Sequence, residues 1–371
     1  MATASQSSAP QSSARQSAQV TVYGAYGHTG RFVVRELQDR GFVPVLSGRD
    51  AVQLDELAAA TRLESRPASV DDAAALDRAL AGSAAVINCA GPFASTAGPL
   101  IESALRTGVP YVDVAAEIEA NVDTFANFAG RADAAGAVVV PAMAFFGGLG
   151  DLLATVAMGD WSSADLVQVG YGLSSWRPTA GTRIAGAVSR ERRGGQFVRF
   201  ADGRLHYVDE HDTSIIDWPF PEPTGTKPLV VEFTMADIVT LPSHLDVREV
   251  RTSMAQAAAN DMASSDTPEP TAADASGRSD QTFAVDVIVQ RGDEQRRAVA
   301  HGRDIYAVTA PLAVEAVARI VDGRVTGSGV SSAGSAFDAA DFLDALAPHI
   351  TWEHLGAVAE PLAVVRSVAT R

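Results

Sequence analysis

Three glycines near the N-terminus, Gly24, Gly27 and Gly30, are the residues whose spacing most directly indicates chemistry. They lie in the segment VTVYGAYGHTGR, which begins at residue 20 with a β-branched run and leads into an apolar periodic segment. A turn between a strand and a helix lets the backbone approach a pyrophosphate, whose charge the helix N-terminus holds. The spacing is GxxGxxG rather than the commoner GxGxxG, and a turn that only connects two elements is the alternative. We predict a dinucleotide site formed by Gly24, Tyr26, Gly27, His28, Thr29 and Gly30.

The end of the second predicted strand indicates which dinucleotide binds. Residues 42–46 are apolar and are followed by Ser47, Gly48 and Arg49. An acidic residue at this place would bind a ribose 2′-hydroxyl, whereas an arginine beside a hydroxyl suits a 2′-phosphate. Ser47 and Arg49 therefore favour NADP over NAD, although a plain surface role is the alternative for Arg49. Asp50 comes next, at the start of a helical pattern, where an N-cap is the expected role.

The elements that must position these residues alternate between helix and strand over residues 19–150. Short apolar runs at 84–89, 111–114 and 137–140 are typical of buried parallel strands, and helical periodicity fills the intervals between them. This order predicts an α/β protein with a Rossmann-type, doubly wound parallel sheet.

Ligands of such sheets bind beyond the carboxyl ends of the strands. That rule selects the loops at 89–93, 113–117 and 146–151, in addition to the glycine turn. Cys89 ends an apolar run, where a free cysteine is more often a small core residue than a nucleophile. We therefore expect no catalytic thiol.

The pattern changes after residue 150. Longer, alternating runs predict a second, α+β domain over residues 151–302, built on a mixed or antiparallel sheet. Residues 255–281 contain few large apolar side chains and are predicted to form a mobile loop. Helical patterns follow within residues 303–350, and we expect this segment to return to the dinucleotide-binding domain. The predicted strands cover residues 166–173, 196–200, 229–234, 246–251, 282–290 and 296–301.

Composition excludes several partners and compartments. The chain has 371 residues, a formal net charge of −16 and a single lysine, Lys227, so it offers no basic surface to nucleic acid or anionic lipid. One cysteine in the whole chain fits a reducing cytoplasm. Residues 1–18 are rich in Ser, Ala and Gln, which predicts a disordered tail rather than a signal peptide. We expect a cytoplasmic protein without a membrane span or a bound metal, and the sequence is compatible with a homodimer.

Several motifs together resemble the saccharopine dehydrogenase-like NADP-binding oxidoreductase family, which includes saccharopine reductases and trans-acting enoyl reductases. The resemblance is good over the first 155 residues, moderate in the C-terminal part and poor in the middle domain. The motifs are GAYGHTGR at 24–31, SGR at 47–49, VINCAGPF at 86–93, GPLIESALRTGVPYVDVAAE at 98–117, AMAFFGGLGDLLA at 142–154 and GRDIYAVTAPLAVEAVARIV at 302–321.

The resemblance implies an NADPH-dependent reductase that transfers a hydride to a C=N or a conjugated C=C bond of a small organic substrate. It also implies that the strand-end turn of Cys89, Ala90, Gly91 and Pro92 contacts the cofactor. Residues 176–183 depart from the glycine-rich stretch associated with enoyl reductases, which argues against that substrate class.

Reduction of either bond also needs a proton donor. Tyr306 follows a charged turn at the start of a helical pattern and is the first candidate, and His301 at a strand end is the second. For both, packing or exposure at the surface is the alternative. Arg183 is a candidate for binding a substrate carboxylate or phosphate, and Asp151 for contacting the substrate. A surface role and a helix cap are their respective alternatives.

Other reaction classes lack their motifs in this chain. No tyrosine is followed four residues later by a lysine, and neither GxSxG nor HExxH occurs. The sequence therefore leaves two hypotheses open, a reductase and a non-catalytic NADP-binding sensor or scaffold. A cleft with an ionisable group beside the nicotinamide would favour the reductase, and a blocked nicotinamide pocket would favour the sensor.

Overall fold

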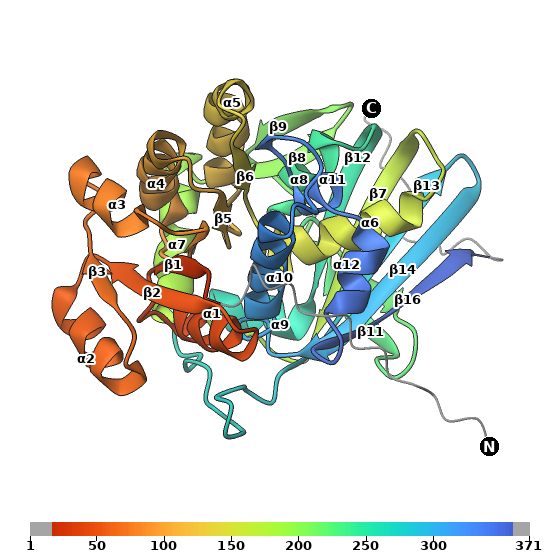
Figure 1. The fold of residues 1–371 in the computed structure, drawn as a ribbon. Helices are drawn as coiled ribbons and strands as arrows, with labels where there is room; N and C mark the ends of the chain where they lie inside the picture. Colours follow the sequence, from red (N-terminus) through yellow and green to blue (C-terminus); the bar gives the residue numbers. More distant parts are fainter. Residues whose placement is uncertain (1–16, 359–371) are drawn as a thin grey trace, which may run out of the picture.

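The computed structural model describes residues 17–358 as two β-sheets with helices packed around them (Figure 1). The tail predicted over residues 1–18 lies almost wholly outside the described residues. The first sheet is parallel, and its strands lie in the order β15-β6-β5-β4-β1-β2-β3. These strands are β1 (Gln19–Tyr23), β2 (Val43–Gly48), β3 (Ser65–Pro67), β4 (Ala85–Asn88), β5 (Tyr111–Asp113), β6 (Val138–Val140) and β15 (Gly329–Val330).

The first sheet confirms the predicted doubly wound fold. The chain runs outward from β1 to β3 and then returns to β4, so the strand order reverses between β1 and β4. Ligands of such sheets bind at this switch point, outside the carboxyl ends of the strands. The helices that connect or cover these strands are α1 (His28–Asp39), α2 (Ala51–Thr61), α3 (Ala73–Leu80), α4 (Phe93–Thr107), α5 (Ile118–Ala134) and α10 (Thr309–Val321).

Alternation along β1 explains why both faces of this sheet are covered. Val20 and Val22 point into the core shared with α1, α2 and α10, whereas Tyr23 points into the core shared with α3, α4 and α5. Both faces are therefore apolar, as expected for a parallel sheet between two helical layers.

The second sheet is mixed, because β7 pairs with β12 in parallel and with β13 in antiparallel orientation. The main order is β10-β11-β12-β7-β13-β14-β16, with the β8–β9 hairpin attached to β12. The strands are β7 (Ala164–Leu173), β8 (Phe197–Ala201), β9 (Arg204–Val208), β10 (Ile215–Pro219), β11 (Thr226–Val230), β12 (Val247–Ala255), β13 (Thr282–Arg291), β14 (Glu294–Arg303) and β16 (Ile350–Ala357).

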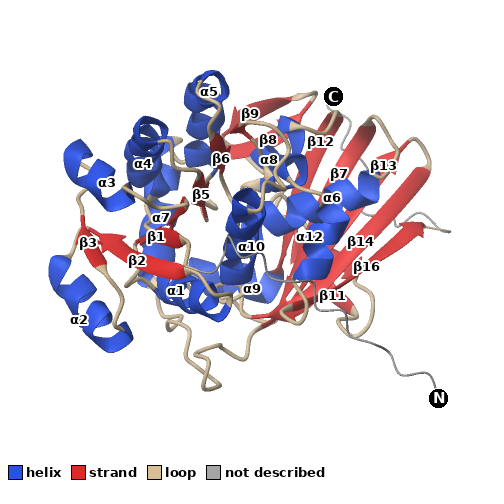
Figure 2. Ribbon diagram, viewed as in Figure 1, coloured by secondary structure: helices blue, strands red, loops and turns tan. Residues whose placement is uncertain are grey.

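The remaining helices lie beside the second sheet or between it and the first (Figure 2). The kinked segment η1 (Phe145–Leu149), in which Phe146 and Gly147 have non-helical backbone angles, leads from the first sheet into α6 (Gly150–Met158). Helix α6 packs against β13 and β14. The other helices are α7 (Ala180–Arg192), α8 (Asp237–Thr240), the 3-10 segment η2 (Leu241–Ser243), α9 (Gln256–Ala263), α11 (Ala333–Ala336) and α12 (Ala339–Ala345).

Two helices of the second part were not expected from the sequence. Helix α9 occupies the first third of the segment 255–281, where a loop was predicted, and Ala258 anchors it in the core. Helix α7 begins at Thr179, whose hydroxyl accepts a hydrogen bond from the Thr182 backbone N–H at 3.1 Å. Only Ser189 of α7 is buried, so its sequence carries little of the apolar periodicity that marks a helix.

The C-terminal segment touches both sheets. Helix α10 packs against α1, β15 extends the first sheet beside β6, and β16 is the last strand of the second sheet. We keep residues 19–150 with 303–350, and residues 151–302, as a proposed division into domains. Among residues 17–358, no helix is long and apolar enough to cross a membrane.

Candidate active site

The glycine turn after β1 has the shape that a dinucleotide pyrophosphate requires. The Gly24 N–H donates to the Ser47 carbonyl at 2.8 Å, and the Gly27 N–H donates back to the Gly24 carbonyl at 3.0 Å. Gly24 has a φ of +83°, and a Cβ placed on Gly30 would lie 2.2 Å from the Gly24 carbonyl oxygen. No side chain caps α1, so its first N–H groups stay available to an anion.

His28 adds a second feature at the start of α1. Its ring lies edge-on to Phe32 and to Tyr306, with centroid distances of 5.4 and 5.2 Å. The buried Nε2 atom has no hydrogen-bond partner among the described residues. Burial lowers the pKa of His28, so the imidazole is neutral at neutral pH. A cofactor group could satisfy this nitrogen, and the turn therefore fits a dinucleotide.

At the end of β2, Ser47, Arg49 and Asp50 have three different environments. Ser47 is fully buried and donates its hydroxyl to the Arg66 carbonyl at 2.8 Å, so it ties β2 to β3. Asp50 caps α2, as expected, by accepting from the backbone of Val52 and Gln53. Arg49 is exposed and makes no hydrogen bond or ion pair within residues 17–358. Its guanidinium is therefore available to a 2′-phosphate, and this role stays a prediction.

A buried polar network shapes the turn after β4. The Asn88 side-chain carbonyl accepts from the Ala90 N–H at 3.0 Å, while its amide donates to Thr96 and to the Tyr111 hydroxyl, each at 3.1 Å. Tyr111 donates in turn to Asp113 at 2.8 Å. These bonds fix the backbone of the turn that contains Cys89, Ala90, Gly91 and Pro92.

Two carboxylates accept backbone hydrogen bonds from segments next to the same turn. Asp113 accepts from the backbone of Ala115 and Ala142, and Glu117 accepts from Phe93 and Ala94 at the start of α4. Burial raises the pKa of both carboxyls. Burial also raises the pKa of the Cys89 thiol, which keeps it protonated and supports the expectation that it is not a nucleophile.

Helix α7 lies over this strand-end turn. A Cβ built on Gly91 would stand 3.8 Å from the Ala185 Cβ, and further along the helix Ser189 donates to Glu119 of α5 at 2.5 Å. An element of the second part therefore borders the carboxyl ends of the parallel strands. In the sequence, residues 176–183 stood out as a departure from relatives and Arg183 as a candidate for binding an anion, but no periodic signal pointed to this helix.

Tyr306 connects α7 with the start of α1. Its ring contacts His28, and its hydroxyl lies 3.0 Å from the Thr182 hydroxyl and 3.2 Å from the Trp176 Nε1. Burial raises the pKa of Tyr306, so the phenol stays protonated at neutral pH. The structure thus brings this predicted residue to the glycine turn, with its hydroxyl hydrogen-bonded to loop and helix groups.

Arg183 lies near Tyr306, on the first turn of α7. Its Nη2 donates to the Thr267 carbonyl at 2.9 Å. Thr267 belongs to the segment that follows α9. In this segment the Glu269 carboxylate accepts from the Ala180 backbone N–H, and the Ser276 carbonyl accepts from Arg35 of α1. Residues 264–280 therefore contact both α1 and α7. Their predicted mobility stays a prediction.

His301 and Asp151 lie elsewhere. His301 is on β14, with its Nδ1 3.3 Å from the Thr224 hydroxyl, and its cross-strand neighbours belong to the second sheet. Asp151 is fully buried in α6 and accepts from His244 at 2.7 Å and from the Gly334 N–H at 2.8 Å. Each Asp151 oxygen thus has a partner within the protein, and the side chain is 0% exposed. Neither residue joins the turns described above.

The described residues contain no cluster of three or more His, Cys, Asp or Glu side chains that could hold a metal ion.

We expect the wild-type protein to bind NADPH at least about tenfold more tightly than NADH, which corresponds to about 1.4 kcal/mol. The reason is that only the 2′-phosphate can pair with Arg49. Fluorescence titration of both cofactors measures the ratio, and Arg49→Ala should bring it close to one by weakening NADPH alone. Arg62→Ala, at the opposite end of α2, is the control. Equal affinities in the wild-type protein would remove Arg49 from the 2′-phosphate site.

The fold and the site together define a Rossmann-type nucleotide-binding protein with a second sheet domain. Comparison with known proteins shows what its nucleotide-binding domain is similar to. Residues 20–140 match the model of the saccharopine dehydrogenase NADP-binding domain. Residues 20–140 are therefore similar to the NADP-binding domain of saccharopine dehydrogenases, and this match confirms NADP as the predicted cofactor.

Two relatives show how far the likeness extends. A probable mitochondrial saccharopine dehydrogenase-like oxidoreductase of Arabidopsis thaliana is 31% identical over 142 residues. The match covers 34% of this chain and 31% of that protein, so this chain spans about a third of the relative's length. The apo saccharopine dehydrogenase (L-Glu forming) of Saccharomyces cerevisiae has the same fold, with a TM-score of 0.62 at 12% identity. That likeness covers 92% of this chain and all of the yeast chain.

Proposed function

We propose that the protein is an NADPH-dependent reductase that transfers a hydride to a C=N or a conjugated C=C bond of a small organic substrate. One observation carries this proposal. Ala185 of α7 lies over the Gly91 turn, and Tyr306 packs against His28 of the glycine turn, so the second part and the returning chain both reach the cofactor turns of the NADP-binding domain. A substrate between the two parts would therefore lie beside the cofactor, at the switch point where such sheets bind ligands.

The protein's own residues have separate tasks in this proposal. The glycine turn and the start of α1 hold the pyrophosphate, Arg49 holds the 2′-phosphate, and residues 89–92 border the nicotinamide half. Bound NADPH supplies the hydride. Tyr306 and Thr182, whose hydroxyls are 3.0 Å apart, form the proposed path for the proton that completes the reduction. Arg183 stands beside this pair as the proposed group for a substrate anion.

A stopped-flow experiment tests the proposal. NADPH absorbance is followed while the protein is mixed with a panel of cyclic and acyclic imines and of α,β-unsaturated carbonyl compounds. The reductase is supported if compounds with one of the two bond types cause NADPH consumption and the matched saturated compound does not. Tight NADPH binding without consumption by any member would favour a non-catalytic NADP-binding sensor. The position of Ala185 beside Gly91 favours this second function, because it limits the space for a substrate next to the proposed nicotinamide position.

Tyr306→Phe should lower kcat by about 100-fold while NADPH affinity stays within about a factor of two, because only a proton contact is lost. The kcat and KM of the variant are measured with the best substrate of the panel. Loss of a proton path lowers kcat alone, whereas loosening of α7 would also raise KM. Tyr207→Phe, on a strand of the second sheet, is the matched control. An unchanged kcat would remove Tyr306 from the proton path.

The cellular setting of this function is also a proposal. We expect a cytoplasmic protein that acts on a small molecule, either alone or as a homodimer, and that does not bind nucleic acid. The Arabidopsis relative, in contrast, is named as a mitochondrial protein. Fractionation of the source cells would decide between the two compartments.

A further inference from the structure

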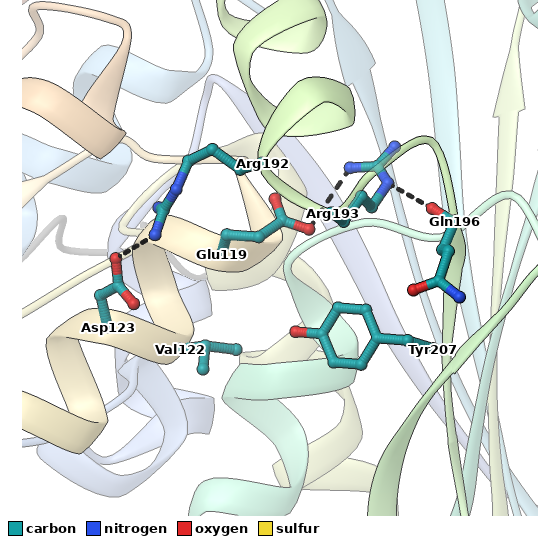
Figure 3. A pocket seen from close by; sticks show the side chains of 7 residues that line it. All are labelled: Glu119, Val122, Asp123, Arg192, Arg193, Gln196 and Tyr207. Atoms are coloured by element: carbon teal, nitrogen blue, oxygen red, sulfur yellow. Dashed lines mark hydrogen bonds and ion pairs between the residues drawn. The ribbon is translucent and has the colours of Figure 1, made fainter.

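A cavity of about 300 Å³ lies at the other end of α7, between α5, the C-terminal end of α7 and strand β9 (Figure 3). Helix α5 belongs to the NADP-binding domain, whereas α7 and β9 belong to the second part. The residues that line it are Glu119, Val122, Asp123, Arg192, Arg193, Gln196 and Tyr207.

This cavity is separate from the crevice where hydride transfer is proposed. Ala185 of α7 lies over Gly91, and Arg192 follows seven residues later on the same helix. At 1.5 Å per residue the two positions are about 10 Å apart. Reacting atoms must approach to about 3–3.5 Å. A small molecule held by Arg192 is therefore too far from the Gly91 turn to receive a hydride.

The walls of the cavity carry both signs of charge. Arg192 pairs with Asp123 at 2.7 Å, and Arg193 approaches Glu119 only to 3.5 Å. The second distance is longer than the 2.7–2.9 Å of a good charge-assisted hydrogen bond. Each guanidinium has five N–H donors, and the contacts within the described residues leave some of them unused on both arginines.

Tyr207 supplies a free hydroxyl to the same space. Its hydroxyl has no hydrogen-bond partner among the described residues and points toward the region between Glu119 and Val122 (Figure 3). Burial and the charges of Glu119 and Asp123 raise the pKa of Tyr207, so it is a neutral donor at neutral pH. The cavity thus offers guanidinium donors, carboxylate acceptors and one phenol within a small volume.

We propose that this cavity binds a small zwitterion, with its carboxylate on Arg192 and Arg193 and its cationic group on Glu119 and Asp123. An anion of the same size would face the two carboxylates, and a cation would face the two guanidiniums, so each would meet repulsion that a zwitterion avoids. A bound zwitterion contacts the NADP-binding domain and the second part at once, outside the hydride-transfer crevice. This site does not depend on the proposed reductase activity.

Three probes with the same four-carbon chain test the proposal: 4-aminobutyrate, succinate and 1,4-diaminobutane. Ligand-observed NMR titration of the wild-type protein should give at least about tenfold tighter binding of 4-aminobutyrate than of the other two. β-Alanine and 6-aminohexanoate vary the distance between the charges. Arg192→Gln and Tyr207→Phe should each weaken 4-aminobutyrate binding about fivefold or more. Arg248→Gln, which removes an exposed pair with Asp202, should leave it unchanged.

The result is decisive if the variants are folded, which near-ultraviolet circular dichroism and an unchanged NADPH affinity establish. The proposal is overturned if none of the three zwitterions binds, if succinate or 1,4-diaminobutane binds as tightly as 4-aminobutyrate, or if Arg192→Gln binds as well as the wild-type protein. Because NADPH consumption is not part of this measurement, failure here leaves the reductase proposal standing.

Discussion

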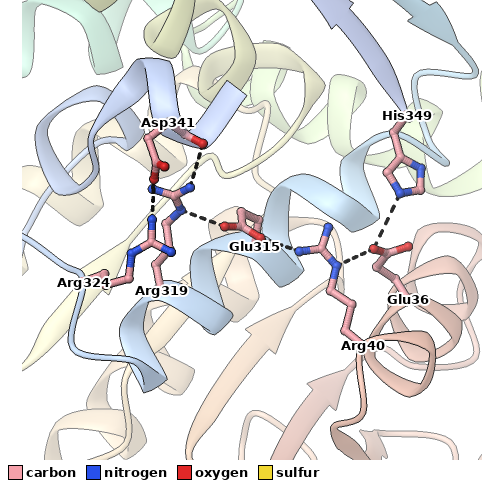
Figure 4. A network of polar contacts seen from close by, with 7 residues as sticks. All are labelled: Glu36, Arg40, Glu315, Arg319, Arg324, Asp341 and His349. Carbon is pink, nitrogen blue, oxygen red and sulfur yellow. Dashed lines mark hydrogen bonds and ion pairs between the residues drawn. The ribbon is translucent and has the colours of Figure 1, made fainter. Parts of the chain in front are cut away.

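Replacing Glu315 by glutamine should lower the free energy of unfolding by about 3 kcal/mol or more. Glu315 of α10 accepts from Arg319 at 2.8 Å and pairs with Arg40 at the end of α1 (Figure 4). The side chains of Glu315 and Arg319 are only 5% and 2% exposed. Removing the carboxylate leaves the buried Arg319 with Asp341, which is 57% exposed, as its remaining counter-charge, and leaves Arg40 with Glu36. The loss of the buried partner costs more than breaking a surface pair.

Urea unfolding of the wild-type protein and Glu315→Gln measures this loss. Glu102→Gln is the matched control, because it removes a helix carboxylate from an exposed pair with Arg131 and should change stability by less than about 1 kcal/mol. Similar values for the two variants would show that the ion network between α1 and α10 contributes no more than a surface pair.

Gly30→Ala is the second variant with a large expected effect, here on the cofactor. The added methyl group would lie 2.2 Å from the Gly24 carbonyl oxygen, so the backbone of the turn has to move. A displacement of this kind should weaken NADPH binding on the order of 100-fold, or about 2.7 kcal/mol, and lower stability by about 1–3 kcal/mol.

NADPH titration and thermal unfolding of Gly30→Ala give both quantities. Gly130→Ala is the control, because Gly130 lies within α5 with no atom within 4 Å of the added Cβ. It should raise stability slightly and leave NADPH affinity unchanged. Wild-type affinity in Gly30→Ala would mean that the pyrophosphate does not rest on this turn.

The first 150 residues show what local pattern can predict. The glycine turn, the apolar strands and the periodic helices were readable because each depends on neighbours in the sequence. In β4 and β5 the register Asn88↔Asp113 brings together a network that no local pattern announces. Tyr111 reads as an ordinary strand residue until that register is known.

The second part was harder to predict for a related reason. Only Ser189 of helix α7 is buried. The helix is held by contacts with residues far away in the sequence, namely Glu119, Gly91 and Tyr306. Position along the chain did indicate that Tyr306 lies near the first part, where its ring packs against His28, because the chain re-enters that part there. Its catalytic role stays a prediction. The same reasoning could not tell which way Asp151 points, since a helix start can present its side chain to a ligand or to its own partners.

Hydrogen–deuterium exchange with and without NADPH tests the central claim most directly, namely that the cofactor lies in a crevice bordered by both parts. The account predicts slower exchange on NADPH binding in residues 24–31, 89–95 and 180–190, with residues 350–357 of β16 unchanged. Protection confined to residues 24–31, with α7 unaffected, would contradict it, because the second part would then not face the bound cofactor.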